Sequence, residues 1–391
     1  MSEQLFEGRR GRLNTTGILA SQNIRDLVAH HRIQADPPVT EDQIQPASID
    51  LRLGPVAYRI AASFLPGTGV RVEDKLERYA MHRLDLADGA VLERGCVYIV
   101  PLLEHLALPA GYSGMANPKS STGRLDVFTR LITDKSGEFE TVADGYAGPL
   151  YAEISPRTFS ILVRQGSRLT QLRLRRGTPR PADARMSRLQ RQLGLVQEDG
   201  AGNTDLLGAA PLPDVDIREG VAIRVDLEGA PGTGLIAYRA RAHTGLIDVD
   251  RSGSCAALDF WDPVYRHPGQ PAELVLNPEE FYILMSKESI LVPPEASAEM
   301  RAVNTRIGEF RAHYAGFFDP GFGMADHGGG GTRAVLEVRS RDVPFLIEDG
   351  QTVCRLVYEQ LLDMPDKLYG RTLGSNYQGQ KLKLSRHFRS D

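Results

Sequence analysis

The chain repeats itself once, and this feature constrains its fold more than any other. The stretch from Ala90 (AVLERGCVYIVPLLEHLALP) resembles the stretch from Leu274 (LVLNPEEFYILMSKESILVPP), and a stretch from Leu150 resembles one from Ala334. The same offset aligns both pairs, which chance rarely produces across so many positions. A fixed-offset similarity within one chain indicates duplicated structural units. We therefore expect two homologous units, at roughly residues 40–175 and 220–365.

Both units consist largely of short apolar runs interrupted by Gly and Pro, such as VYIVPLLEHLALP and RAVLEVRSRDVPFLI. This texture is typical of strands and turns in a β sandwich or barrel. Two stretches have a helical period instead. One is SQNIRDLVAHHRI near the start, with Ser21 as its expected N-cap, and the other is DARMSRLQRQLGL at 183–195. The sequence predicts a mainly β chain with a few helices.

The composition is that of an ordinary globular protein without a basic surface for nucleic acid. The net charge is −4 and the pI is about 6.2, whereas a duplex-binding domain usually carries a basic face. The three cysteines are too far apart in sequence for a disulfide framework or a zinc knuckle. No apolar run approaches the roughly 18 residues of a membrane span. We expect a cytoplasmic protein with no DNA, RNA or membrane partner.

Several common catalytic motifs are absent. Zinc-dependent nucleobase deaminases need an H-x-E and a P-C-x-x-C, because zinc generates their hydroxide, and this chain has no C-x-x-C. It also lacks H-E-x-x-H and the nucleophile elbow, and no G-x-G-x-x-G opens a helix after a strand. We therefore expect no zinc and no metal ligands supplied by the protein.

One carboxylate occurs at the same place in both units. Glu153 (PLYAEIS) and Glu337 (RAVLEVR) each lie among apolar residues of an expected strand. An isolated glutamate of this kind is more often a solvent-facing strand residue, but its presence in both units favours a function. A carboxylate in a partly apolar pocket has a raised pKa and can act as a general base toward water.

The loop PKSSTGR at 118–124 combines cations, hydroxyls and a glycine. It is not a P-loop, in which the lysine follows the last glycine. Its counterpart in the second unit, RAVNTR at 301–306, keeps a cation at each end but lacks the two serines. Cations at both ends suit a polyphosphate, although such a loop alone is also compatible with an ordinary turn.

Five motifs, in order, resemble the dCTP deaminase branch of the dUTPase-like superfamily. They are QPASIDLRLG at 45–54, KSSTGR in place of the R-S-S-x-x-R motif, the run from Gly166 to Leu172, DPGFG at 319–323 followed by VLE at 335–337, and a tail with Tyr369, Tyr377 and Gln380. Together they cover nearly the whole chain outside 176–220. The resemblance implies two dUTPase-like units in tandem, each a distorted, jelly-roll-like β-barrel.

The resemblance also implies an activity, the zinc-independent hydrolysis of dCTP to dUTP and ammonia in pyrimidine deoxynucleotide metabolism. Glu337 or Glu153 would deprotonate the water that attacks C4, and Ser120 and Arg124 would help to hold that water and the base. Mg²⁺ would arrive with the triphosphate and would need no ligands from the protein. The implied partner is the nucleotide dCTP, and relatives of this kind imply a homo-oligomer.

The resemblance implies binding roles as well. The loop would contact the nucleotide through Lys119, Ser120, Ser121, Thr122, Gly123 and Arg124. Asp319 and the backbone of Val335 and Leu336 would read the deoxyribose and the cytosine. The tail would cover the phosphates through Tyr369, Asn376 and Gln380, where Asn376 stands in place of the lysine common in the family.

Each unit lacks a different part of the family pattern. The first has KSSTGR and Glu153 but no D-P-G, whereas the second has DPGFG and Glu337 but Ala302 and Val303 in place of the serines. We therefore expect one composite site, with serines from the first unit and Glu337 from the second. The expected divisions are 1–175 (helix and first barrel), 176–220 (helical or linker connector), 221–365 (second barrel) and 366–391 (tail).

Alternative interpretations are open at this point. A dUTPase usually ends in a G-F-G-S-T-G tail, whereas this chain has SNYQGQ, and a bifunctional deaminase and diphosphatase would differ only in its product. A duplicated chain that has lost motifs could also be a non-catalytic, nucleotide-binding paralogue. Release of ammonia from dCTP separates that last possibility from an active deaminase.

Overall fold

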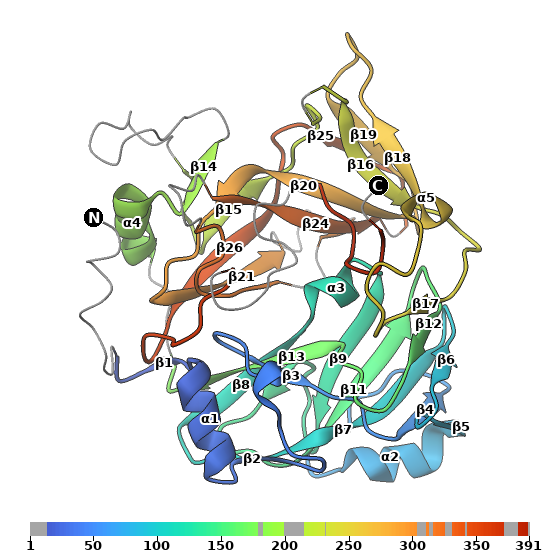
Figure 1. The fold of residues 1–391 in the computed structure, drawn as a ribbon, viewed down its shortest axis with the longest axis vertical. Helices are drawn as coiled ribbons and strands as arrows, with labels where there is room; N and C mark the ends of the chain where they lie inside the picture. The colour runs from blue at the N-terminus through green and yellow to red at the C-terminus, as the bar shows by residue number, and fades with distance from the viewer. Residues whose placement is uncertain are drawn as a thin grey trace.

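The chain forms two stacked β units, drawn from blue to green and from yellow to red in Figure 1. Most of the described structure outside turns and loops is strand, which confirms the expected fold class. The structure is a computed structural model, and it describes residues 14–178, 183–198, 215–230, 232–302, 310–312, 316–324, 331–340, 342–370 and 382–389.

The first unit has two main antiparallel sheets. One has the strand order β1-β13-β8-β10, with β3 beside β13, and the other has the order β5-β4-β7-β11-β9, with β2 beside β7. Its elements are β1 (Gly17–Ile18), α1 (Ser21–Ala29), β2 (Ile33–Ala35), the 3-10 helix Glu41–Gln43, β3 (Ile49–Leu51), β4 (Val56–Ile60), α2 (Val72–Tyr79), β5 (Ala80–Asp85), β6 (Ala90–Leu92), β7 (Val97–Ala107), β8 (Tyr112–Pro118), α3 (Ser120–Gly123), β9 (Val127–Thr133), β10 (Thr141–Val142), β11 (Ala147–Pro156), β12 (Ile161–Val163) and β13 (Thr170–Arg176).

The second unit repeats this plan, with the strand orders β15-β26-β21-β23 and β18-β16-β20-β24-β22. Its elements are α4 (Asp183–Leu193), β14 (Val196–Glu198), β15 (Val221–Arg224), β16 (Leu235–Ala240), β17 (Ile247–Asp248), α5 (Ala257–Phe260), β18 (Trp261–Tyr265), β19 (Glu273–Leu276), β20 (Phe281–Ile290), β21 (Ala296–Ala302), β22 (Phe310–Ala312), β23 (Phe317–Phe318), β24 (Thr332–Ser340), β25 (Phe345–Glu348) and β26 (Thr352–Gln360). The segment expected to be a connector supplies α4 and β14. Strand β14 pairs with β20, so this segment packs as part of the second unit.

The duplication is visible in the register of the strands. Ile161 of β12 lies opposite Leu92 of β6, and Phe345 of β25 lies opposite Leu276 of β19. Leu92 and Leu276 are also the residues that the sequence repeat aligns. The two units therefore share their pairing geometry as well as their sequence pattern.

Each unit contains an ion pair between an arginine and a buried glutamate at the same place. In the first, the Arg52 Nε donates to Glu104 at 2.8 Å, and the Arg52 backbone N–H donates to the same carboxylate at 2.9 Å. In the second, Arg224 makes the same two contacts with Glu288, at 2.6 Å and 2.8 Å. Both carboxylates are buried. Each one ties the end of a short strand, β3 or β15, to a long central strand and satisfies the backbone N–H of the arginine.

The same sheet face is covered differently in the two units. In the first unit, α2 places Val72 and Leu76 over the face that carries Ile99 and Tyr151. In the second unit, the corresponding face packs against the first unit. There Ile283 and Val335 belong to one continuous apolar cluster with first-unit residues. On the first unit this sheet face is therefore covered by helix α2, whereas on the second unit the same face is covered by the first unit.

The boundary between the units is continuous with the core. Trp261, the only tryptophan of the chain, is fully buried there and packs against Phe159 of the first unit, with ring centroids 5.5 Å apart. Strand β17 of the second unit pairs in parallel with β12 of the first. Arg164 adds a bidentate ion pair to Asp248 at 2.8 Å and 2.9 Å. Because apolar core, strand pairing and charge all cross this boundary, the two units form one body.

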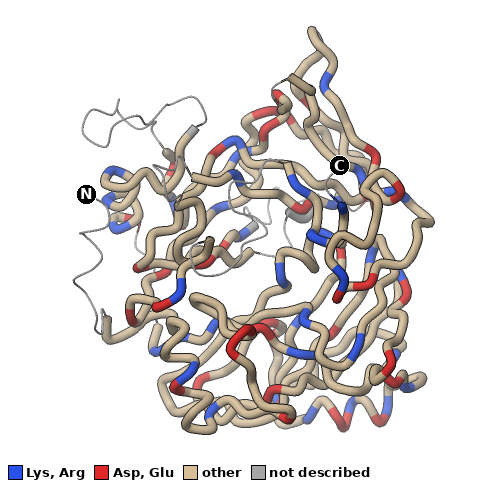
Figure 2. The backbone as a smooth tube through the Cα atoms, in the orientation of Figure 1, with Lys and Arg blue, Asp and Glu red and all other residues tan. Residues whose placement is uncertain are grey.

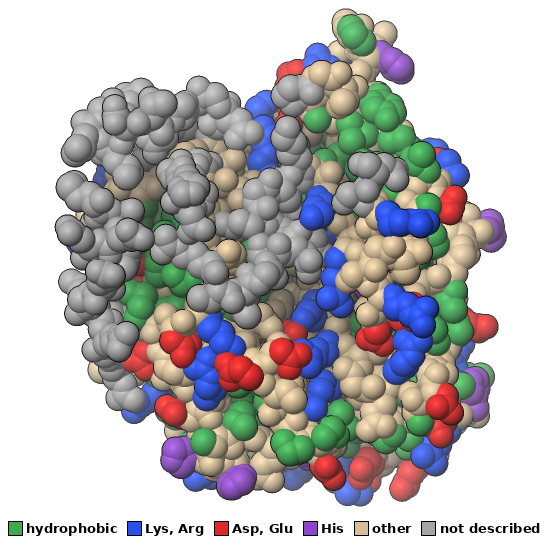
Figure 3. Space-filling view, viewed as in Figure 1, with side chains coloured by type: hydrophobic (Ala, Val, Ile, Leu, Met, Phe, Trp, Pro, Cys, Tyr) green, Lys and Arg blue, Asp and Glu red, His purple; other side chains and the backbone are tan. Residues whose placement is uncertain are grey.

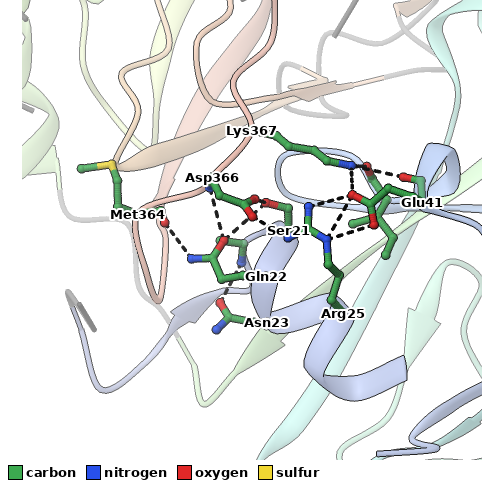
Figure 4. A network of polar contacts seen from close by, with 10 residues as sticks. Ser21, Gln22, Asn23, Arg25, Glu41, Met364, Asp366 and Lys367 are labelled. Carbon is green, nitrogen blue, oxygen red and sulfur yellow. Dashed lines mark hydrogen bonds and ion pairs between the residues drawn. The ribbon is translucent and has the colours of Figure 1, made fainter. Parts of the chain in front are cut away.

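Helix α1 fixes the chain beyond β26 to the first unit (Figure 4). The prediction that Ser21 is the N-cap is wrong, because Ser21 is the first helical residue and its hydroxyl donates to Asp366. The side chain of Asn23 accepts from the N–H of Ala20 at 3.0 Å and so takes over the capping. A carboxylate at a helix N-terminus is favoured by the helix dipole. This contact anchors the segment that leads to Tyr369.

Charged residues of both signs are distributed over both units (Figure 2). Among the described residues, no helix has the length and apolar character needed to cross a membrane.

Glu104→Leu should lower the free energy of unfolding by about 3–5 kcal/mol, because the charge of Arg52 stays buried without its counter-ion. The double variant with Arg52→Met should recover most of this loss. Thermal denaturation measures both. As a control, Arg71→Ala removes an exposed pair with Asp74 and should leave the midpoint unchanged. A double variant as unstable as Glu104→Leu would contradict the assignment.

Candidate active site

The loop PKSSTGR folds into a single helical turn at the boundary between the units (Figure 1). Strand β8 ends at Pro118, and the carbonyl of Lys119 accepts from the N–H groups of Thr122 and Gly123 at 2.8 Å and 2.9 Å. Ser121, Thr122 and Gly123 are buried, whereas Lys119 and Ser120 are partly exposed. The turn therefore presents its first two residues outward and places its end against the second unit.

The carboxylate of Glu337 lies directly against the end of this turn. A Cβ atom placed on Gly123 would be 2.4 Å from Glu337 Oε2 and 2.7 Å from its Cδ. Glu337 is only 2% exposed. A side chain at this position would have to displace the Glu337 carboxylate, because real Cβ atoms essentially never make contacts this short. A general-base candidate of the second unit thus touches the serine-bearing turn of the first.

Lys119 is held by a carboxylate that sequence reasoning did not single out. Its Nζ donates to Oδ2 of Asp50, which lies on β3 and is 2% exposed. The β3 strand lies beside β13, which also pairs with β8. The ammonium group of Lys119 is therefore oriented before any ligand is present.

Asp319 of the DPGFG turn reaches the same region from the second unit. It lies 3.6 Å from the guanidinium of Arg173, which is itself buried and donates to the carbonyl of Ala298 at 3.1 Å. Burial raises the pKa of the Asp319 carboxyl above its usual range; Asp50 adds to this effect, while Arg173 and Lys119 oppose it. Asp319 is thus within electrostatic reach of the Lys119–Asp50 pair.

The C-terminal segment 382–389 packs on the same helical turn. The Ser385 hydroxyl donates to the carbonyl of Ser121 at 2.8 Å, and Arg124 donates to the carbonyl of Lys383 at 3.0 Å. Phe388 adds a ring to the aromatic cluster around Trp261. Although Arg124 is predicted to meet the nucleotide, it is 4% exposed, so at least part of its role here is to join the turn to this segment.

Glu153, the counterpart of Glu337, lies in a different environment. The Arg130 Nε donates to its carboxylate at 3.1 Å, and the Arg130 guanidinium stacks on the ring of Phe139 at 3.4 Å. Glu153 lies opposite Ile99, as Glu337 lies opposite Ile283. The two glutamates occupy equivalent positions, but Glu153 is engaged in an ion pair within its own unit.

The other predicted residues fall into three groups. Val335 faces the boundary, whereas the Leu336 side chain points into the second core, so only its backbone is available to a ligand there. The Tyr369 N–H donates to the carbonyl of Pro320 at 2.9 Å, which places it beside the DPGFG turn. Asn376, Gln380 and residues 303–306 of the RAVNTR loop lie outside the described residues.

Sequence reasoning missed three contact residues inside or beside motifs that it recognised. Asp50 belongs to QPASIDLRLG, and Arg173 follows the run from Gly166 to Leu172. Asn117 directly precedes PKSSTGR, and its Oδ1 accepts from the N–H of Gly316 in the other unit at 2.7 Å. An acidic residue between the two apolar residues of the strand IDL was the available signal for Asp50, whereas Arg173 lies among other polar residues in TQLRLRR.

Lys and Arg side chains gather along the middle of the face drawn in Figure 3, over the boundary between the units. Such a concentration of positive charge suits a polyphosphate. Among the described residues, no three His, Cys, Asp or Glu side chains cluster as ligands of a metal ion. The described charged groups at this boundary therefore include these cations and the carboxylates of Asp50, Asp319 and Glu337.

Two protein-family models match the chain. The one described as "2'-deoxycytidine 5'-triphosphate deaminase (DCD) N-terminal domain" matches residues 15–178, and the corresponding C-terminal domain matches residues 182–388. A crystal structure of 2'-deoxycytidine 5'-triphosphate deaminase from Agrobacterium tumefaciens is 52% identical, covers 89% of this chain and 100% of that one, and superimposes with a TM-score of 0.82.

Curated relatives match shorter stretches. A Halobacterium salinarum protein named "dCTP deaminase, dUMP-forming" is 30% identical over 122 residues, which is 30% of this chain and 58% of the relative. A Parafrankia protein of the same name is 30% identical over 167 residues, 41% of this chain and 78% of the relative. The chain thus spans less than two thirds of the first of these relatives.

Gly123→Ala should lower kcat for dCTP, the substrate that the sequence resemblance implies, by about 100-fold, because the new methyl group displaces the Glu337 carboxylate by about 1 Å. Release of ammonia measures the change. Gly137→Ala is the matched control, since an added Cβ meets nothing within 4 Å there. Equal activity of the two variants would mean that the contact between Gly123 and Glu337 has no part in turnover.

Proposed function

The chain belongs to the dCTP deaminase family, and from this premise we propose that it hydrolyses dCTP to dUTP and ammonia at one composite site between its two units. The observation that carries the proposal is the contact between the Glu337 carboxylate and Gly123. It joins the general-base candidate of one unit to the serine-bearing turn of the other. The second unit lacks the serines in its own sequence, and the first unit lacks the D-P-G turn.

The chemistry assigned to Glu337 is proton transfer. Its carboxylate takes a proton from the attacking water, and the resulting hydroxide adds to C4 of the cytosine ring. The proton then passes to the exocyclic amino group, the C4–N bond breaks, and ammonia leaves. A general base must lie within hydrogen-bond reach of its proton donor. Ser120, a partly exposed residue of the turn, and Arg124 would hold this water and the cytosine ring.

The triphosphate would be bound by the cationic side of the same turn. Lys119 and Arg124 supply the charge, and Ser121, Thr122 and Gly123 supply the turn itself. Lys119 is already oriented by Asp50, so little side-chain ordering is needed when phosphate binds. Mg²⁺ shares the charge of the triphosphate and would arrive with the nucleotide, without ligands from the protein.

The deoxyribose and the cytosine would be read by the second unit. Asp319 and the backbone of Val335 and Leu336 are the assigned groups, and Tyr369, Asn376 and Gln380 are assigned to cover the phosphates. Because the pKa of Asp319 is raised, its carboxyl keeps its proton more readily than an ordinary aspartic acid does. A protonated carboxyl can donate a hydrogen bond to a sugar oxygen or to the base as well as accept one.

Glu153 is assigned a structural role in this proposal. Its carboxylate is engaged by Arg130, and α2 covers the sheet face around it. The Oε1 atom of this carboxylate accepts from the guanidinium, and the positive charge beside it makes the carboxylate a weaker acceptor of a proton from water. The first unit would therefore contribute the turn and the second unit the base.

A second product is supported by the names of the curated relatives, several of which are "dCTP deaminase, dUMP-forming". In that case the same nucleotide would lose pyrophosphate after deamination. The chain would then be a bifunctional deaminase and diphosphatase. The tail sequence SNYQGQ differs from the glycine-rich tail of a dUTPase, which favours deamination as the first activity.

We further propose that the protein acts on free nucleotide, in the cytoplasm and as a homo-oligomer, without a DNA, RNA or membrane partner. The net charge of −4 supports a small-molecule substrate over a nucleic acid.

Glu337→Gln should abolish turnover of dCTP, with a loss of at least about 1,000-fold in kcat, because the amide cannot accept the proton from water. Glu153→Gln should keep most of the activity. Ammonia release from dCTP, with and without Mg²⁺, measures both variants. The reverse ranking would place the working base in the first unit, and a wild-type protein that releases no ammonia would be a non-catalytic nucleotide binder.

The product should be dUTP rather than dUMP if deamination is the only reaction. Chromatography of the nucleotides after complete turnover distinguishes the two, and a pyrophosphate assay provides an independent measurement. Stoichiometric dUMP and pyrophosphate would establish the bifunctional enzyme instead. In both cases one ammonia should be released for each dCTP consumed.

A further inference from the structure

A buried ion pair crosses the boundary between the units close to Glu337. The Arg339 Nη2 donates to Oδ2 of Asp126 and, at 2.8 Å, to the hydroxyl of Thr158. The Thr158 hydroxyl in turn donates to the same carboxylate oxygen at 2.5 Å. The side chains of Arg339 and Asp126 are 7% and 0% exposed. Two charges so deeply buried form a pair whose geometry is tightly constrained.

The pair is directly connected to the site by the chain. Arg339 follows Glu337 by two residues on β24, so both side chains point to the same face of the strand. Asp126 follows Gly123 by three residues, and its N–H donates to the Gly123 carbonyl at 2.9 Å. Two successive side chains on one face of β24 therefore contact the two ends of one short turn: Glu337 meets Gly123, and Arg339 meets Asp126.

Asp126 is itself fixed in place. Its φ is +55°, in the left-handed region that L-residues seldom adopt. Its carbonyl accepts from the N–H of Arg157 at 2.9 Å. Other charges near the pair belong to Glu279, which lies 3.4 Å from Arg339 and is 64% exposed, and to Arg157, which contacts Glu279 at 3.8 Å. Glu279 is too exposed to replace Asp126 as the buried counter-ion.

The pair occurs once in a duplicated chain. The position equivalent to Arg339 in the first unit is Ser155, two residues after Glu153. The position equivalent to Asp126 in the second unit, counted from the RAVNTR loop, is Gly308. Neither carries a charge. The ion pair is therefore present only at the boundary where Glu337 meets the serine-bearing turn, and it is absent from the reverse combination.

We propose that Asp126 and Arg339 are positioning residues that hold β24 in register on the turn, so that the Glu337 carboxylate stays against Gly123. This inference rests on the proposed function, because it concerns the geometry of that same site. Neither residue touches the nucleotide in this account. If the pair is lost, β24 is free to shift along the turn, and a displacement of about 1 Å at a catalytic group can cost about 100-fold in rate.

The test compares kinetics and structure in the full-length protein. Arg339→Gln should lower kcat for dCTP by about 100-fold and change KM by less than about threefold, because the triphosphate-binding cations are untouched. Arg339→Lys keeps the charge and should recover part of the loss. In the double variant Asp126→Asn/Arg339→Gln, the loss should be smaller than the product of the two single losses, because no buried charge is left alone.

Arg164→Gln is the matched control. It removes another ion pair across the same boundary, the bidentate pair with Asp248, which is not part of the turn. This variant should keep kcat within about twofold even where its thermal midpoint falls as far as that of Arg339→Gln. The fluorescence of Trp261, the only tryptophan, reports whether the buried core between the units is intact, and its emission should be unchanged in both variants.

A readout independent of turnover separates this inference from the proposed function. Hydrogen exchange of the amides of residues 120–126 should accelerate in Arg339→Gln and in the double variant but not in Arg164→Gln. Unchanged exchange, or equal losses of kcat in Arg339→Gln and Arg164→Gln, would overturn the positioning role. A wild-type protein that releases no ammonia would overturn the proposed function, and the exchange experiment would still decide whether the pair orders the turn.

Discussion

The structure depends on one asymmetric contact: the outer face of the sheet with β20 and β24 packs on the first unit. This contact buries Ile283, Val335 and Trp261 in a core shared by both units. It also brings Glu337 to the turn at Gly123. Apolar burial supplies the main driving force for such a contact, but it does not by itself define an orientation. The directional contacts at this boundary include the pairing of strands β12 and β17 and the ion pairs Arg164–Asp248 and Arg339–Asp126.

In the proposed composite site, the two units of the duplication have different roles. Both units keep the same strands and the same register around their glutamates. In the first unit, α2 and Arg130 enclose the face around Glu153, and the serine-bearing turn is kept. In the second unit, the face around Glu337 is left for the partner unit to cover. Two identical half-sites are not required for one complete site, so each copy was free to lose the part that the other supplies.

Comparison of the two repeats predicted which parts should come together, but not what holds them. The absence of serines from RAVNTR, with Glu337 in the same unit, was sufficient to predict a composite site. Repetition alone was a weaker guide to chemistry, because Glu104 and Glu288 also recur and serve as buried partners of arginines. The contacts of Asp50 and Arg173 depend on neighbouring strands far apart in the sequence. Only the assembled sheets bring those residues to the boundary, so the local sequence does not indicate which partners they contact.

The asymmetry of the contact also limits where a further β unit could pack on this chain. Its two contacting surfaces differ, and a heterologous contact of this kind can in principle continue from unit to unit until a ring closes or a filament grows. Here it cannot continue at the first unit, because the face that would receive another serine-bearing turn lies under Val72 and Leu76 of α2. Arg130 neutralises the charge of Glu153, which such a turn would otherwise meet. A contact between copies of this chain at this covered face would therefore require α2 to move, and without that movement it would not create a second site at Glu153.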